Sequence, residues 1–254
     1  MSRIITGQDI RTIAIVLTGV MFVAWGIGRW LGIRLRDKGI TQPSKFADAS
    51  MALLGLLIAF TFGMSIERHD RRRQAAVADS NAIGDFYTCA AMLKEPTRTK
   101  LQTVIQHYAQ LRLQMARGVR EGADIESALE TSEEMHDEMT QLVREALNNG
   151  TPIAVSLTNT LNGVTSNQAS RLSAYRDRLP VSIVLLLFAA ALSSVMLIGR
   201  EEGRTDIPDA VGTVFFILLV VVAIYVTLDL NRPEAGLIRV SQEPIERLLN
   251  SVSK

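Results

Sequence analysis

The sequence has few of the residues on which many catalytic and disulfide-bonded domains depend. Its 254 residues include one cysteine, Cys89, and three scattered histidines. One cysteine excludes an intrachain disulfide, and histidines this few and this far apart do not indicate a metal centre. No glycine-rich phosphate loop follows a strand pattern, and no nucleophile has an activating neighbour along the chain. The sequence therefore predicts neither an enzyme nor a site for a metal or another cofactor.

A strong charge of either sign is also absent. The chain has 27 basic and 26 acidic side chains, and its net charge is +1. A nucleic-acid-binding domain normally carries a marked basic excess, so binding to nucleic acid is not expected.

Long apolar runs are the main feature that is present. They cover residues 12–33, 49–66, 180–199 and 210–228. Their only charged side chain is Arg29. A helix needs about 20 apolar residues to cross about 30 Å of hydrocarbon. We therefore predict an all-α integral membrane protein with four transmembrane helices in the lipid bilayer, paired as residues 1–66 and 180–228.

The positions of Lys and Arg beside these runs predict the orientation. Eleven arginines flank the side of the two termini and the long middle segment: Arg3, Arg11, Arg68, Arg71, Arg72, Arg73, Arg171, Arg176, Arg178, Arg232 and Arg239. Six basic residues flank the other side: Arg34, Arg36, Lys38, Lys45, Arg200 and Arg204. The excess of positive charge is normally cytoplasmic. We expect a multi-pass protein of the cytoplasmic (inner) membrane with both termini inside.

Residues 67–179, between spans two and three, are predicted to form a cytoplasmic bundle of helices. The second span continues without proline or glycine into charged sequence, so one helix should leave the membrane and run toward Leu93. Apolar residues three and four apart then predict helices at about 101–115, 124–147 and 153–175. Thr151 followed by Pro152 is typical of a helix start.

Residues 229–254 are predicted as a cytoplasmic tail that ends in a short amphipathic helix, at about 243–252. Its apolar face either packs on the bundle or lies among the lipid headgroups. Asp229, at the end of span four, is expected to form an ion pair with Arg68, Arg71 or Arg72, because a carboxylate at the membrane boundary is costly when it is neither hydrated nor paired.

Span two has one polar face. Thr61, Ser65, Arg68 and Arg72 are spaced so that they lie on the same side of a helix. In one interpretation the arginines anchor the helix at the membrane surface and the hydroxyls bond to backbone carbonyls. In the other, several copies of the helix line a water path, with a hydrophobic ring at Ile58 or Phe62.

Two segments resemble the signatures of a bacterial family of bestrophin-like membrane proteins. The first is LLIAFTFGMSIERHDRRR at 56–73 followed by ADSNAIG at 78–84, and the second is LDLNRPEAGLIRV at 228–240. Bestrophins are pentameric ion channels whose second span lines the pore. The resemblance implies a homo-oligomer that conducts inorganic ions. It also implies pore-lining roles for Ile58, Phe60, Thr61, Phe62 and Ser65, and a cytoplasmic pore mouth at Arg68, Arg71 and Arg72. The alternative is a non-conducting scaffold or sensor whose cytoplasmic domain binds a partner.

Overall fold

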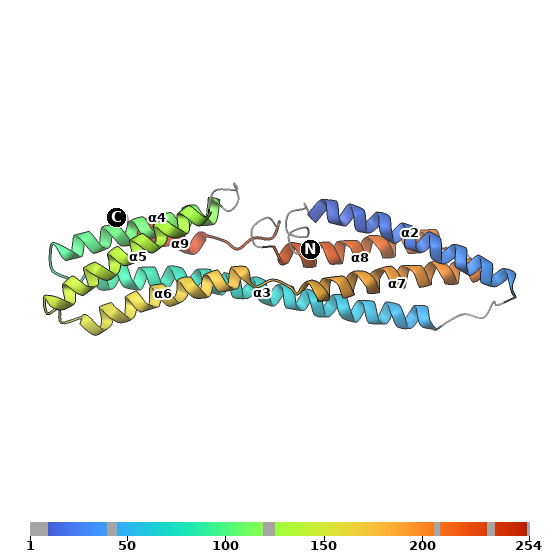
Figure 1. Cartoon of the computed structure of the whole chain (residues 1–254), viewed down its shortest axis with the longest axis horizontal. Coiled ribbons are helices and arrows are strands. Elements are labelled where there is room, and N and C mark those ends of the chain that lie inside the picture. The colour runs from blue at the N-terminus through green and yellow to red at the C-terminus, as the bar shows by residue number, and fades with distance from the viewer. Residues whose placement is uncertain (1–9, 40–44, 119–124, 206–208, 233–236, 253–254) are drawn as a thin grey trace. The chain divides into compact units, whose positions relative to one another are not determined.

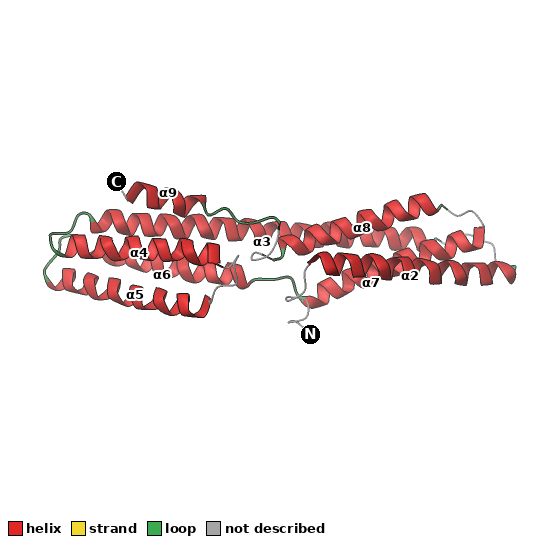
Figure 2. Cartoon of the chain, turned by 90° about the horizontal axis from the view of Figure 1, so that it is seen from above, coloured by secondary structure: helices red, strands yellow, loops and turns green. Residues whose placement is uncertain are grey.

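The computed structural model describes residues 10–39, 45–118, 125–205, 209–232 and 237–252, and all regular structure in them is helical (Figures 1 and 2). The helices are α2 (Ile10–Asp37), α3 (Phe46–Ala90), α4 (Thr97–Gly118), α5 (Ile125–Asn148), α6 (Ala154–Arg176), α7 (Val181–Thr205), α8 (Ala210–Leu230) and α9 (Glu243–Val252). The all-helical prediction is confirmed for this part of the chain. The chain forms two compact units, unit 1 from residues 1–67 with 178–232, and unit 2 from 68–177 with 233–254.

Unit 1 contains four helical stretches that are long and apolar enough to cross a membrane. They lie in Ile10–Asp37, Phe46–Ala90, Ala154–Thr205 and Ala210–Leu230. Their inward side chains form one core, with Met21, Leu54, Val195 and Ile217 at 1% exposure or less. Large apolar side chains also cover the outside of the unit, as expected of helices whose solvent is lipid. These features indicate a membrane protein. Which membrane it occupies, and on which side its termini lie, stay predictions.

The closest helix packing in unit 1 joins α2 to α7. Each helix carries the sequence Gly-Arg-x-x-Gly, at residues 28–32 and 199–203. A Cβ atom on Gly32 would lie 2.1 Å from the carbonyl oxygen of Arg200, and one on Gly203 would lie 2.3 Å from that of Arg29. Small residues let helix backbones approach in this way within lipid. The two helices therefore run parallel at backbone contact.

Unit 2 is built from α4, α5, α6, α9 and the part of α3 beyond Arg68. Its core contains the fully buried side chains of Phe86, Leu101, Ile105, Met139 and Leu157. Helix α4 packs against α5 and α9, and α5 packs against α6. The cytoplasmic location of this unit stays a prediction.

The start of α6 differs from the prediction at Thr151. Helix α5 ends in a tight turn, where Gly150 has a φ of 71° and donates to the carbonyl of Leu147. The Thr151 N–H also bonds back to α5, at the carbonyl of Ala146. This pattern is a Schellman motif, so Thr151 completes the end of α5. Helix α6 begins at Ala154, after Ile153, whose side chain makes no capping bond.

Candidate functional site

Helix α3 is the longest helix described and belongs to both units. It runs for 45 residues, from the membrane segment into charged sequence. Proline is absent from this stretch, and its glycines cost too little to break a helix that tertiary packing supports. The candidate residues therefore lie on one continuous helix.

The two hydroxyl side chains of the polar face point into unit 1. Thr61 is 4% exposed, and its hydroxyl donates to the carbonyls of Leu57 (2.8 Å) and Ile58 (3.1 Å). Ser65 is fully buried, and its hydroxyl oxygen has no hydrogen-bond partner in the described structure. The bonds of Thr61 match the first interpretation of this face, in which hydroxyls satisfy backbone carbonyls.

The remaining span candidates differ in exposure. Phe60 is 70% exposed, Phe62 is 37% exposed and Ile58 is half-buried. Leu56 and Gly63 lie on the same side of α3 as Phe60, and both are exposed. The outward face of the membrane part of α3 is therefore apolar, and Phe60 is its most exposed aromatic residue.

The three arginines expected at the pore mouth have different surroundings within unit 2. Arg68 forms an ion pair with Asp177, with Nε and Oδ1 3.2 Å apart. Arg72 is 1% exposed and donates to the backbone carbonyls of Ala174 (3.1 Å) and Asp177 (2.6 Å). Arg71 is exposed. The contacts of Arg68 and Arg72 thus hold the end of α6 against α3.

Asp229 is 2% exposed near the end of α8. Its carbonyl accepts the backbone N–H of Arg232. Its expected ion pair with an arginine of span two stays a prediction.

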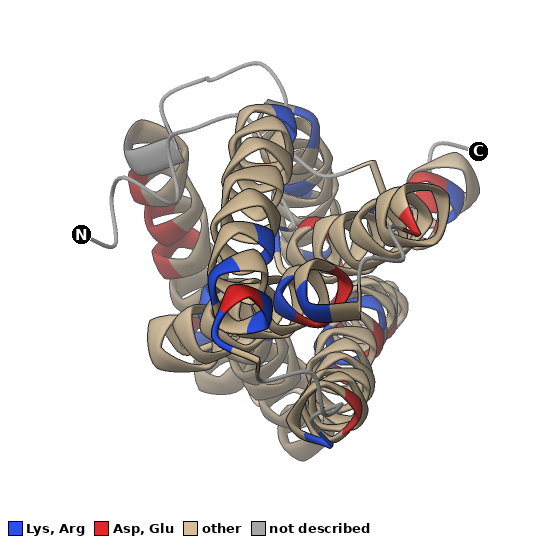
Figure 3. Ribbon diagram, turned by 90° about the vertical axis from the view of Figure 1, so that its right-hand side faces the viewer, with Lys and Arg blue, Asp and Glu red and all other residues tan. Residues whose placement is uncertain are grey.

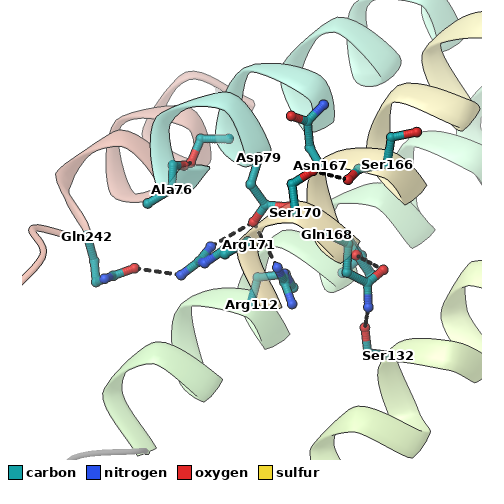
Figure 4. A network of polar contacts seen from close by, with 12 residues as sticks. Ala76, Asp79, Arg112, Ser132, Ser166, Asn167, Gln168, Ser170, Arg171 and Gln242 are labelled. Carbon is teal, nitrogen blue, oxygen red and sulfur yellow. Dashed lines mark hydrogen bonds and ion pairs between the residues drawn. The ribbon is translucent and has the colours of Figure 1, made fainter. Parts of the chain in front are cut away.

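A buried ionic cluster in unit 2 was not anticipated from the sequence (Figure 4). Asp79 of α3 is fully buried, and its Oδ2 accepts bonds from Arg112 of α4 (2.9 Å) and Arg171 of α6 (2.7 Å). Both arginines are less than 9% exposed. Arg171 also donates to the side chain of Gln242, just before α9, at 2.9 Å. Through Asp79 the cluster joins α3, α4 and α6, and Arg171 links it further to the segment before α9.

A tyrosine beside this cluster extends the polar network. The Tyr108 hydroxyl donates to Gln168 (2.9 Å), whose amide donates to Ser132 (3.3 Å). Burial raises the pKa of the Tyr108 phenol, which keeps the group a neutral donor.

The sequence contains a signal for this cluster. Arg112 continues the apolar stripe of α4 four residues after Tyr108, and Arg171 lies on the stripe of α6 seven residues after Val164. A charge on the apolar stripe of a helix is buried on folding and needs a buried partner.

The C-terminal helix α9 packs on unit 2, which decides between the two positions left open for it. Ile245 is 1% exposed and lies in the core of the unit. At the other end of α9, the carbonyl of Val252 accepts bonds from Gln106 (2.7 Å) and Tyr87 (3.4 Å). Arg117 of α4 pairs with Glu246 at 2.8 Å.

The comparison with family models bears on these features. The model of the bestrophin-like domain matches residues 14–245, which include α3, the buried cluster and the start of α9. The chain belongs to the bestrophin-like family. No curated protein and no solved structure matches it. Within the described residues of this bestrophin-like chain, no three His, Cys, Asp or Glu side chains are grouped as metal ligands would be.

Proposed function

We propose that this bestrophin-like protein is an oligomeric ion channel of the cytoplasmic membrane and that α3 lines its pore. The observation that carries the proposal is the family membership over residues 14–245. The length of α3 supports it, because a single helix of 45 residues can continue a pathway from the membrane into the aqueous phase.

The exposed face of α3 is the face that copies of the chain could turn toward a shared axis. Leu56 and Phe60 are 62% and 70% exposed, and the space next to Gly63 is open. A ring of Phe60 side chains would form a hydrophobic constriction, which gates by excluding water. The same face continues into Glu67 and Asp70, which are exposed and polar.

We propose other roles for the remaining candidates. Thr61 and Ser65 are buried by neighbouring helices of unit 1. In this proposal they pack α3 against those helices and do not face the pore. Ile58 and Phe62 lie between the buried and the exposed faces. Of the three arginines at the proposed mouth, Arg71 is the exposed one.

A non-conducting scaffold or sensor is the second candidate. An open groove of about 750 Å³ lies between α3 and α9 in unit 2 and favours this candidate. The groove has polar and apolar residues on both walls, among them Asn81, Asp85, Arg247 and Leu248. A partner could bind there without any ion flow.

Conductance of the purified full-length protein in planar bilayers tests the channel directly. We expect discrete current steps, and we expect Phe60→Ala to change their size because it widens the constriction. Phe215→Ala is the matched control, since Phe215 on α8 is also 70% exposed. Absence of current from correctly folded wild-type protein contradicts the channel and leaves the scaffold. Equal effects of the two substitutions contradict the role of Phe60.

A further inference from the structure

Two arginines follow the apolar part of α7 on one side of the helix. Arg200 and Arg204 are four residues apart, so they lie one above the other. Arg204 is 4% exposed, and Arg200 is half-buried against α2. Figure 3 looks onto this end of α2 and α7, where basic and acidic positions occur together.

The guanidinium groups of these arginines are incompletely satisfied. The Nε atoms of Arg200 and Arg204 are both buried, and neither has a hydrogen-bond partner in the described structure. Glu201 accepts one bond from Arg204 Nη1 at 3.2 Å. A buried donor without an acceptor is costly. Of the two arginines, Arg200 keeps partial exposure, so an acceptor from outside the chain has access to this pair at Arg200.

Glu202, the carboxylate next to Glu201, bonds to donors other than these arginines. Glu202 accepts a bond from Trp25 Nε1 at 3.0 Å and another from the hydroxyl of Thr213. Both donors are neutral, and they tie α7 to α2 and α8. Arg29 on α2 lies over the Trp25 ring, 5.8 Å from its centroid, and adds a further positive charge.

The glycine crossing explains why the arginines are held in place. The backbone of α7 touches both glycines of α2: a Cβ on Gly28 would lie 2.0 Å from the carbonyl oxygen of Met196, and one on Gly32 would lie 2.1 Å from that of Arg200. The arginine is thereby fixed on a rigid helix pair at the end of the membrane segment. An anion bound there would meet donors that are already positioned, which lowers the entropic cost of binding.

We propose that Arg200 and Arg204 bind a phosphate group. Guanidinium groups match the geometry of phosphate oxygens and form two parallel bonds to them. Arg200 directly follows the apolar run, so the phosphate of an anionic phospholipid headgroup is at the right depth. Free inorganic phosphate has the same chemistry and is the other source.

Thermal unfolding of the purified full-length protein in detergent tests the site with three probes: short-chain phosphatidylglycerol, inorganic phosphate and a phosphate-free galactolipid of the same chain length. We expect phosphatidylglycerol to raise the melting temperature and the galactolipid to leave it unchanged. A rise with inorganic phosphate alone assigns the site to the free ion.

Variants separate binding at the site from general association with the protein surface. Arg200→Gln should remove at least half of the rise in melting temperature. Arg200→Lys should retain part of it, because lysine keeps the positive charge but lacks the planar guanidinium group that forms two parallel bonds to phosphate. Arg34→Gln is the control, since Arg34 stacks on Trp30 at the same end of α2, 3.7 Å from the ring centroid. No shift with either phosphate probe, equal shifts with the galactolipid, or a full shift in a folded Arg200→Gln protein would overturn the proposal.

Discussion

At the scale of single residues, the glycines of the α2–α7 crossing decide how closely two helices approach. Gly32→Ala would place a methyl group against the carbonyl oxygen of Arg200, whereas the space beside Gly26 on the same helix is open. We expect Gly32→Ala to destabilise the protein by about 1–3 kcal/mol through overpacking. Gly26→Ala should be neutral or stabilising by up to about 1 kcal/mol, because alanine favours helix. Melting temperatures in detergent compare the two, and equal values would contradict the crossing.

The buried carboxylate of unit 2 gives a second prediction at this scale. Asp79→Asn leaves Arg112 and Arg171 buried without their counter-charge, and breaking such an ion pair costs about 3–5 kcal/mol. Asp85→Asn, at an exposed position one turn and a half further along α3, should change stability by less than about 0.5 kcal/mol. Chemical denaturation of the two variants measures the difference. If the Asp79→Asn protein is as stable as the Asp85→Asn control, the cluster contributes little to the free energy of unfolding.

At the scale of the element, the tail helix depends on its docking site. A helix of ten residues is marginal in water by itself, so α9 forms because Ile245 enters the core of unit 2. Ile245→Ala should cost about 2–4 kcal/mol and expose residues 243–252 to solvent.

Hydrogen exchange along the tail measures this release. The control is Arg247→Ala, which changes an exposed residue of the same helix. We expect fast exchange of the α9 amides in Ile245→Ala and near wild-type protection in the control. Unchanged protection in Ile245→Ala would mean that the hydrogen bonds to Val252 hold the tail without the apolar contact.

Some features of these helices can be predicted from the sequence, and others cannot. The four apolar runs and the continuity of α3 are local properties, so composition and the absence of proline were enough to predict them. The buried face of α3 is not a local property. Lipid and neighbouring helices are equally apolar, so the pattern of residues 49–66 cannot tell which of them a side chain meets. Thr61 and Ser65 lie on the side of α3 that packs inward, and which side of the helix meets water stays a prediction.

The buried cluster was missed for a related reason. Asp79, Arg112 and Arg171 come from three helices, and their partnership exists only once those helices pack together. Each residue alone is compatible with a solvated helix surface. Their positions on apolar stripes were the available signal, and this signal becomes specific only when opposite charges on different helices are considered together.

At the scale of the whole molecule, the chain consists of a membrane unit, a second helical unit and the helix α3, which belongs to both. The family membership suggests an ion channel, and in our proposal the exposed side of α3 lines its pore. Assembly of several copies is required by this account, because one α3 helix cannot enclose a pathway. The claim that the exposed side of α3 lines a conducting pore is therefore the one on which the function rests.

Single-channel recording of cysteine variants exposed to a membrane-impermeant thiol reagent tests this claim most directly. Single cysteines at Phe60 and Gly63, on the exposed face, are compared with cysteines at Thr61 and Ser65, on the buried face, in a Cys89→Ala background. The account predicts that the reagent reduces the current of Phe60→Cys and Gly63→Cys and leaves that of Thr61→Cys and Ser65→Cys unchanged. Block at Thr61→Cys and Ser65→Cys alone, or no current in the folded Cys89→Ala background, would contradict it.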